Sequence, residues 1–355
     1  MAIFRSEREG RLRLKIGPDA EEALRILNKK ALKGNNEATE QIGLALEDAY
    51  KRLLQPSLET EARNEANKQA DEEAIDVFGE NLRQLMWAPP LGQKNVLAID
   101  PGYRTICKLV CLNAQGDFLT NDTIYPFYSG DKKQEALNKF YSLLHQYQIQ
   151  AIAIGNGREA ERWVKSMKWA GYLSIFSVYE SGASVYSASE AAREEFPSLD
   201  LTVRGAISIG RRLMAPLAEL VKIDPKSIGV GQYHYEVNQK RLKERLDQVV
   251  MHCVNRVGVH VNMAGKHLLT YGSGLGPQLA QNIVVYKSQN GAFNSRSALK
   301  KVPKLGAKAF EQAAGFLRIP ESKHPLDNSG VHPESYGVVE QMAKDLNCNI
   351  HDLLE

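Results

Sequence analysis

The sequence predicts a multidomain fold of α and α/β class for this 355-residue chain. Three observations predict it. Residues 1–92 show mostly helical periodicity and end in a stiff Pro-Pro-Leu-Gly run. From residue 95 the period changes, and short apolar strands alternate with helices, which indicates a mixed sheet with helices packed on it. From residue 238 helical spacing returns and is interrupted by two glycine-containing hairpins.

The composition, with 43% hydrophobic and 25% charged residues, is that of an ordinary soluble protein. A net charge of +3 excludes a strong overall attraction to nucleic acid, so such binding must come from local patches. No apolar run reaches membrane-spanning length and no signal-peptide core is present, so we expect no membrane partner. Four scattered cysteines form no disulfide pattern and indicate a reduced, cytoplasmic protein.

The first part of the chain is predicted to be helical and to carry no chemistry. Residues Arg11–Ile16 alternate between basic and apolar side chains, which predicts a short exposed strand. Pro18-Asp19 opens one helix, and a second follows Gly34-Asn35-Asn36. A third helix is predicted at about 57–77, and its apolar stripe continues through 78–86.

The middle part is predicted to form the sheet. Its elements in order are strands at 95–99, 105–113 and 118–125, a helix at 132–147, a strand at 151–157, a helix at 159–170 and a strand at 175–180. The first strand ends on Asp100 and the last on Glu180. Open α/β sheets place their sites at the carboxyl ends of strands, so both carboxylates are site candidates.

Two carboxylates at neighbouring strand ends are what a metal-dependent phosphodiester-cleaving site needs, because they can hold magnesium for attack by water. A third carboxylate would be Asp200, or Glu236 as a second choice. The structural alternative is that Asp100 belongs to an ordinary turn and that Glu180 caps the helix beginning near Ala183. No His-x-x-x-His or Cys-x-x-Cys spacing offers another metal site.

Further helices are predicted from 183 and at about 203–221, followed by a glycine-rich segment and an amphipathic helix at 238–257. The run Gly272-Ser273-Gly274-Leu275-Gly276 then fits the hairpin of a helix-hairpin-helix motif. Backbone amides of such a hairpin can bind a phosphate without reading a base. Lys304-Leu305-Gly306 repeats the pattern about 30 residues later with lysine in place of the first glycine.

The cations around these hairpins favour a polyanion over the alternative that the hairpins serve only as packing modules. They are Lys287, Arg296, Lys300, Lys301, Lys304 and Lys308.

With these residues, the sequence resembles the bacterial Tex family of transcription accessory proteins over nearly all its length. The resemblance is carried by Pro89–Gly92, Leu97–Gly102, Glu180–Ser187, Ser208–Leu213, Pro216–Val221, Asp224–Tyr233, Ala314–Ile319 and Val331–Glu334. It implies a helical part, a YqgF domain of RNase H-like fold and tandem helix-hairpin-helix units. Ala215 departs from the family pattern, which generally has Asp there; Ile106 stands for Gly, and Glu236 for the common Asp.

Five segments are therefore expected. They are a mostly helical domain at 1–92, a YqgF/RNase H-like domain at 93–222, a connecting segment at 223–237, a tandem helix-hairpin-helix domain at 238–330 and a C-terminal helical tail at 331–355. The family usually also carries an N-terminal helix-turn-helix region and a C-terminal OB-type RNA-binding barrel. We expect this chain to correspond to the central portion, without that barrel.

The resulting hypothesis is a cytoplasmic nucleic-acid-binding protein of Tex type, in which the YqgF domain is structural. It grips the backbone of RNA or DNA, largely without sequence preference, and its partners include the transcription or translation machinery. The predicted nucleic-acid-binding residues are Gly272, Gly274, Gly276, Lys300, Lys301, Lys304, Gly306 and Lys308. One alternative is a RuvC-like nuclease with catalytic Asp100, Glu180 and Asp200 and with magnesium on Asp100 and Glu180. Another is a protein-interaction scaffold.

Overall fold

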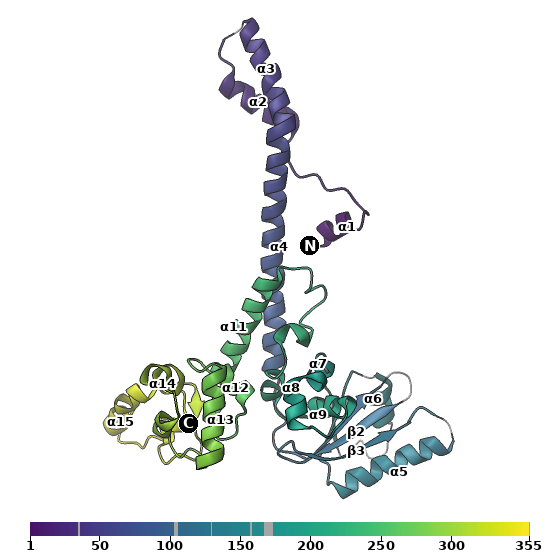
Figure 1. Ribbon diagram of the computed structural model, residues 1–355, viewed down its shortest axis with the longest axis vertical. Coiled ribbons are helices and arrows are strands. Elements are labelled where there is room, and N and C mark those ends of the chain that lie inside the picture. The colour runs from purple at the N-terminus through teal and green to yellow at the C-terminus, as the bar shows by residue number, and fades with distance from the viewer. Residues whose placement is uncertain (35, 103–105, 129, 157, 167–172, 355) are drawn as a thin grey trace. The chain divides into compact units, whose positions relative to one another are not determined.

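The computed structural model describes residues 1–34, 36–102, 106–128, 130–156, 158–166 and 173–354 (Figure 1). Two compact units make up the chain: residues 1–77 with 233–241, and residues 78–232 with 242–355. The boundaries fall inside two long helices, α4 (Gln55–Met86) and α11 (Gln239–Val257). The compact units therefore divide the chain differently from the predicted boundaries at 92 and 222.

The first unit is helical. Its elements are α1 (Ala2–Arg8), α2 (Ala20–Ala31), α3 (Glu37–Ala49), a π-helical turn (Tyr50–Leu54) and the first part of α4. The carboxylate of Asp19 accepts hydrogen bonds from backbone amides in the first turn of α2. The side chain of Asn36 caps α3 in the same way, through the amide of Thr39. Both helices begin where the sequence predicts, because these side chains satisfy amides that lack intrahelical partners.

The strand predicted at Arg11–Ile16 is wrong, because this segment forms no ladder with another strand. The amide of Leu14 donates to the Glu7 carboxylate at 3.0 Å, and that of Ile16 to the Glu59 carboxylate at 3.4 Å. Side-chain oxygens thus replace the carbonyls that a neighbouring strand would supply. An alternating pattern alone does not provide that neighbour.

The second unit contains the predicted mixed sheet, with strand order β3-β2-β1-β4-β5. The strands are β1 (Val96–Pro101), β2 (Cys107–Leu112), β3 (Phe118–Ile124), β4 (Ala151–Ile154) and β5 (Ser174–Ser177). β1 pairs antiparallel with β2 and parallel with β4; β2 and β3 are antiparallel, and β4 and β5 parallel. All strands except β2 therefore end at the same edge of the sheet.

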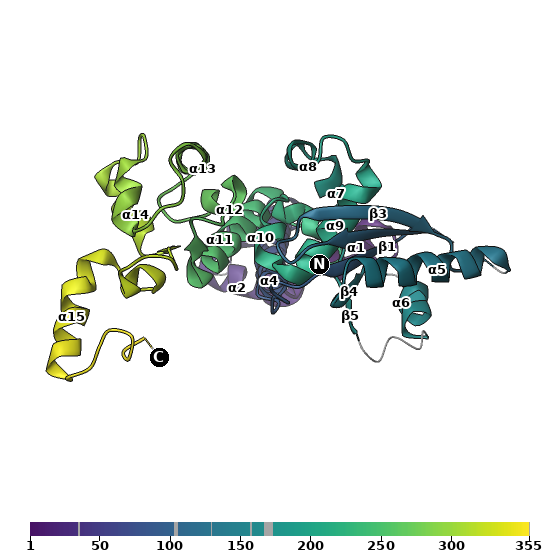
Figure 2. The same cartoon turned by 90° about the horizontal axis from the view of Figure 1, so that it is seen from below.

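Helices cover both faces of this sheet (Figure 2). They are α5 (Asp131–Gln146) and α6 (Arg158–Lys165) on one face, and α7 (Ala183–Ala188), α8 (Glu190–Glu195) and α9 (Leu201–Met214) on the other. Leu97 and Ile99 bury with α5, whereas Val96 and Ala98 bury with α9. Since side chains alternate along a strand, Asp100 belongs to the α9 face.

The helix predicted at 203–221 is broken at Ala215, after which α10 (Pro216–Leu220) begins. Pro216 occupies the first turn of α10, where its missing amide costs no hydrogen bond. A 3₁₀ turn (Pro225–Ile228) lies in the glycine-rich segment that leads to α11.

The remainder of the second unit consists of short helices. They are α12 (Lys266–Thr270), α13 (Pro277–Asn290), a 3₁₀ helix (Arg296–Lys301), α14 (Ala307–Ala314), 3₁₀ turns at Pro325–Asn328 and Pro333–Ser335, and α15 (Tyr336–Asp345). β6 (Val259–His260) pairs parallel with β7 (Leu317–Arg318) and so joins the two ends of the hairpin region. In the part of the chain that the structure describes, no helix is long and apolar enough to cross a membrane.

Candidate functional site

The two hairpins share one backbone hydrogen bond. In the first, the amide of Leu275 donates to the Gly272 carbonyl at 3.1 Å; in the second, the amide of Leu305 donates to the Val302 carbonyl at 3.1 Å. Leu275 and Leu305 are both buried and anchor their hairpins. The sequence repeat therefore corresponds to a structural repeat, α12–hairpin–α13 followed by a 3₁₀ helix–hairpin–α14.

The first glycine of the pattern and its replacement adopt the same left-handed conformation, with φ of 76° at Gly274 and 66° at Lys304. Lysine bears the steric cost of that conformation, which glycine avoids. Gly274 also packs closely, since a Cβ there would lie 2.6 Å from the Cβ of Gln312 and 3.2 Å from the Ala309 carbonyl oxygen, both in α14. The first hairpin thus packs closely against α14 of the second motif.

The third hairpin position begins a helix in each motif. Gly276 is the N-cap of α13 and Gly306 the N-cap of α14, and neither helix has a side-chain cap. A Cβ at either glycine would meet nothing within 4 Å. Backbone amides at a helix start that lack a side-chain cap can donate to an anion.

The second hairpin is rimmed by four exposed lysines, Lys300, Lys301, Lys304 and Lys308. The ammonium of Lys300 lies 4.8 Å from the ring centroid of Phe310. Lys304 and Lys308 lie two residues before and two residues after Gly306, so they add positive charge close in the chain to the start of α14.

Two cations counted toward this patch are structural instead. The Lys287 ammonium donates to the carbonyls of Val261, Asn262 and Ala264 at 3.0–3.3 Å. Arg296 is 1% exposed. Its guanidinium donates to the carbonyls of Leu317, Ser329 and Val331 and to the Tyr336 hydroxyl. Both side chains hold loops together and are not available to a polyanion.

The structure brings Asp100 and Glu180 together on the α9 face of the sheet. Burial and then the charge of Glu180 raise the pKa of Asp100 from 3.8 to about 6. The Oε2 atom of Glu180 is buried and has no hydrogen-bond partner among the described residues. Glycines make the space: a Cβ at Gly155 would lie 2.1 Å from that oxygen, and a Cβ at Gly205 would lie 3.5 Å from Asp100 Oδ2.

Arg212 belongs to this site, although the sequence pattern did not single it out for chemistry. It is 4% exposed, and its Nη1 donates to the carbonyls of Tyr179 and Ser181 at 2.9 and 2.8 Å. Those bonds fix the residues on either side of Glu180. Its burial lowers its pKa, and the charges of Glu219 and Glu180 oppose that shift. Its place on the inner, largely apolar face of α9 is the sequence signal that could have predicted a buried arginine here.

The two candidates for a third carboxylate have other partners. Asp200 is the N-cap of α9, and its Oδ1 accepts from the amides of Thr202 and Val203 at 2.7 and 3.1 Å. Hydrogen bonding to Thr202 is the largest cause that lowers its pKa. Glu236 lies in the other compact unit, where it pairs with Arg5 and Arg8.

The donor set at this site consists of carboxylate oxygens. Within the described ranges, no three His, Cys, Asp or Glu side chains are arranged to hold a metal ion. The unpartnered oxygen of Glu180 and the neighbouring Asp100 are the donors that fit magnesium. Among the described residues, the carboxylates gathered here are thus Asp100 and Glu180.

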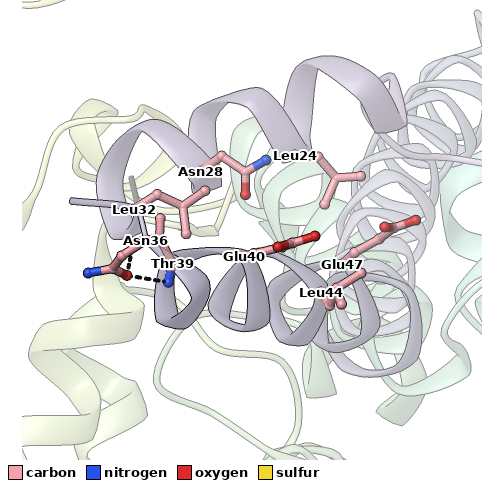
Figure 3. A pocket seen from close by; sticks show the side chains of 9 residues that line it. Leu24, Asn28, Leu32, Asn36, Thr39, Glu40, Leu44 and Glu47 are labelled. Carbon is pink, nitrogen blue, oxygen red and sulfur yellow. Dashed lines mark hydrogen bonds between the residues drawn. The ribbon is translucent and has the colours of Figure 1, made fainter. Parts of the chain in front are cut away.

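A separate open groove lies between α2 and α3 (Figure 3). Its lining includes the side chains of Leu24, Leu44, Asn28, Glu40 and Glu47, and none of its lining residues is cationic. A phosphate-bearing ligand would find no counter-charge among these lining residues.

A five-stranded mixed sheet of this order, followed by repeated helix-hairpin-helix motifs, defines a multidomain α and α/β protein. Family models match the chain as a Tex protein YqgF-like domain at residues 94–214, a helix-hairpin-helix motif at 254–318 and an HHH domain at 324–355. Over its matched length the chain belongs to the Tex family.

Relatives of this chain agree with this assignment. "Protein tex" of Bordetella pertussis is 44% identical over 376 residues, which cover 100% of this chain and 47% of that protein. "Transcriptional accessory protein Tex" of Neisseria gonorrhoeae is 51% identical over 305 residues (84% and 40%), and "Uncharacterized protein YdcI" of Bacillus subtilis is 47% identical over 355 residues (98% and 49%). The chain spans about half the length of the curated relatives it matches.

Proposed function

We propose that this chain binds the backbone of RNA or DNA through its two hairpins and acts as an accessory to transcription. The observation that carries the proposal is the repeated hairpin, in which Gly276 and Gly306 each start a helix without a side-chain cap and face open space. The name of the Neisseria relative, a transcriptional accessory protein, supports the cellular role.

The hairpins are suited to phosphates and not to bases. Free amides at the starts of α13 and α14 donate to phosphate oxygens, and the lysines beside the second hairpin add charge. Neither element presents a long helix or a ribbon for a groove, so the contact is to the backbone and is independent of sequence. Two hairpins in tandem contact successive phosphates of one strand.

The proposal is tested by replacing two lysines of the second hairpin, Lys301→Glu together with Lys304→Glu. We expect weaker binding to every sequence alike, by at least about tenfold, because the new charges repel phosphate. Fluorescence anisotropy with duplexes of unrelated sequence measures this. Lys323→Glu, an exposed lysine outside the hairpins, is the control and should bind as the unmodified chain does. Unchanged affinity of the double variant, or loss for one sequence only, contradicts the proposal.

A second candidate function is favoured by the paired carboxylates. In that case Asp100 and Glu180 would hold magnesium, which would supply an activated water for phosphodiester cleavage. Arg212 would keep Glu180 oriented through its bonds to the adjacent carbonyls. The test is incubation of labelled single strands, duplexes and four-way junctions with magnesium or manganese. Cleavage that Asp100→Asn abolishes supports the nuclease; intact substrate that is still bound leaves the domain structural.

A further inference from the structure

Two tyrosines are displayed on an anchored turn that follows β3. Tyr125 and Tyr128 are 41% and 42% exposed, and their ring centroids lie 6.0 Å apart in an edge-to-face arrangement. Between them, Pro126 is buried and Phe127 packs against the core under α5. The turn is therefore held from below while both aromatic rings face solvent, where such large side chains lack a packing role.

The tyrosines lie beside the start of α5, which carries an unusual charge arrangement. The Lys132 ammonium is 4.7 Å from the Tyr128 ring centroid and 5.8 Å from that of Tyr125. The first turn of α5 holds Asp131, Lys132 and Lys133, and its N-cap Gly130 offers no side-chain cap. The two lysines outnumber the one carboxylate, so the start of the helix keeps a net positive charge that favours a bound anion.

Sheet register places this patch at the same edge as the carboxylate pair. Ile124 at the end of β3 is opposite Cys107, and Cys107 is opposite Pro101, which directly follows Asp100. Because β3 and β1 run in the same direction, Tyr125 continues the row in which the strands end. A strand of nucleic acid held by the tyrosines would lie along the edge that carries Asp100.

We propose that Tyr125, Tyr128 and the start of α5 form a second nucleic-acid contact, which binds one unpaired nucleotide of a single strand. The base stacks on an exposed tyrosine ring, and the adjoining phosphate lies between the α5 amides and the two lysines. Paired bases are stacked on each other and cannot occupy such a platform. The contact goes beyond the proposed hairpin function, because it selects single strands where the hairpins do not.

The test uses the whole chain and three probes: short oligo(U) RNA, oligo(dT) DNA and a blunt duplex. Replacing both tyrosines, Tyr125→Ala with Tyr128→Ala, is expected to weaken binding to both single strands by about tenfold and to leave duplex binding unchanged. Loss on RNA alone or on DNA alone would still support stacking and identify the preferred strand. Unchanged single-strand binding, or an equal loss on the duplex, overturns the proposal.

A matched control keeps the rings, Tyr125→Phe with Tyr128→Phe, and should bind single strands as the unmodified chain does. Failure of the hairpin function is distinguishable, because Lys301→Glu with Lys304→Glu acts on duplex and single strand alike. If that hairpin variant has no effect while the alanine pair still weakens single-strand binding, only the hairpin proposal fails. A 5-bromouracil oligonucleotide cross-linked to the chain should in addition modify Tyr125 or Tyr128; cross-links confined to residues outside this turn argue against the platform.

Discussion

The carboxylate of Asp100 is largely buried and lies near the charge of Glu180, so its ionised form is unfavourable. Its pKa of about 6 lies above the ordinary 3.8, so the folded protein binds this proton more tightly than the unfolded chain does. The resulting stabilisation is complete below the ordinary pKa and is lost as the pH rises through about 6. At neutral pH the ionised side chain therefore destabilises the sheet.

Asp100→Asn should accordingly stabilise the sheet domain near neutral pH, by about 1–3 kcal/mol, since the amide carries no charge to bury. The difference between variant and parent should shrink as the pH falls from about 6 towards 3.8, because Asp100 becomes protonated first in the folded state and then in the unfolded state. Hydrogen exchange of the β1 and β4 amides measures the local free energy of opening. A variant that is less stable than the parent at neutral pH, or a difference that does not change with pH, contradicts this account.

The two N-cap glycines are matched in motif position and differ in backbone conformation. Gly276 has φ 86° and ψ 170°, a region that is essentially restricted to glycine, whereas Gly306 has φ −72° and ψ 169°, which any residue adopts. We therefore expect Gly276→Ala to cost about 1–3 kcal/mol and Gly306→Ala to be close to neutral. Urea unfolding of both variants measures the difference. Equal effects would mean that the two hairpins are not related in the way the structure shows.

At this scale the sequence predicted some features and missed others. Asp100 and Glu180 were predicted at the ends of neighbouring strands. Asp100 lies near the end of β1, whereas Glu180 lies beyond the end of β5 at Ser177, and β4 separates these two strands. Gly155 and Arg212 were missed because their roles depend on what α9 and the 179–181 segment place beside them. A short-range sequence pattern carries no information about a contact between distant segments. It therefore identifies the carboxylates and not the residues that surround them.

At the scale of an element, α10 begins without a capping side chain. Its N-cap is the exposed Ala215, where the resemblance to the Tex family led us to expect an aspartate. Ala215→Asp should stabilise the second unit by about 1 kcal/mol, because the carboxylate can accept from amides of the first turn. Thermal unfolding measures this, with Ala215→Asn as an uncharged capping control. A destabilised Asp variant beside a stabilised Asn variant would mean that the negative charge, and not capping, dominates.

Helices were predicted well where a local signal marks their ends. Asp19 and Asn36 cap α2 and α3, whereas the break between α9 and α10 before Pro216 was not predicted. The failed strand at Arg11–Ile16 shows the limit, since a strand also needs a partner that is distant in sequence. The cations predicted to bind a polyanion show the same limit. Lys304 is exposed as expected, whereas Arg296 is buried by contacts with residues up to forty positions away in the sequence.

At the scale of the whole molecule, the chain joins a sheet domain and a hairpin region. The alternation of strands and helices predicted the first, and the repeat of Gly274-Leu275-Gly276 as Lys304-Leu305-Gly306 predicted the second. Neither pattern predicted the division into compact units, because that division cuts through α4 and α11, where the helical period is continuous.

The central claim is that the hairpins bind a nucleic-acid backbone, and the most direct measurement is the salt dependence of affinity. Binding of a random-sequence duplex is measured over a range of salt concentrations, and log Kd is plotted against log salt. The unmodified chain should lose affinity steeply, and Lys301→Ala with Lys304→Gly should lower the slope by about 1 per lysine that contacts phosphate. Glycine at 304 keeps the left-handed backbone, so only charge is removed. A flat response, or an unchanged slope in the variant, contradicts the claim.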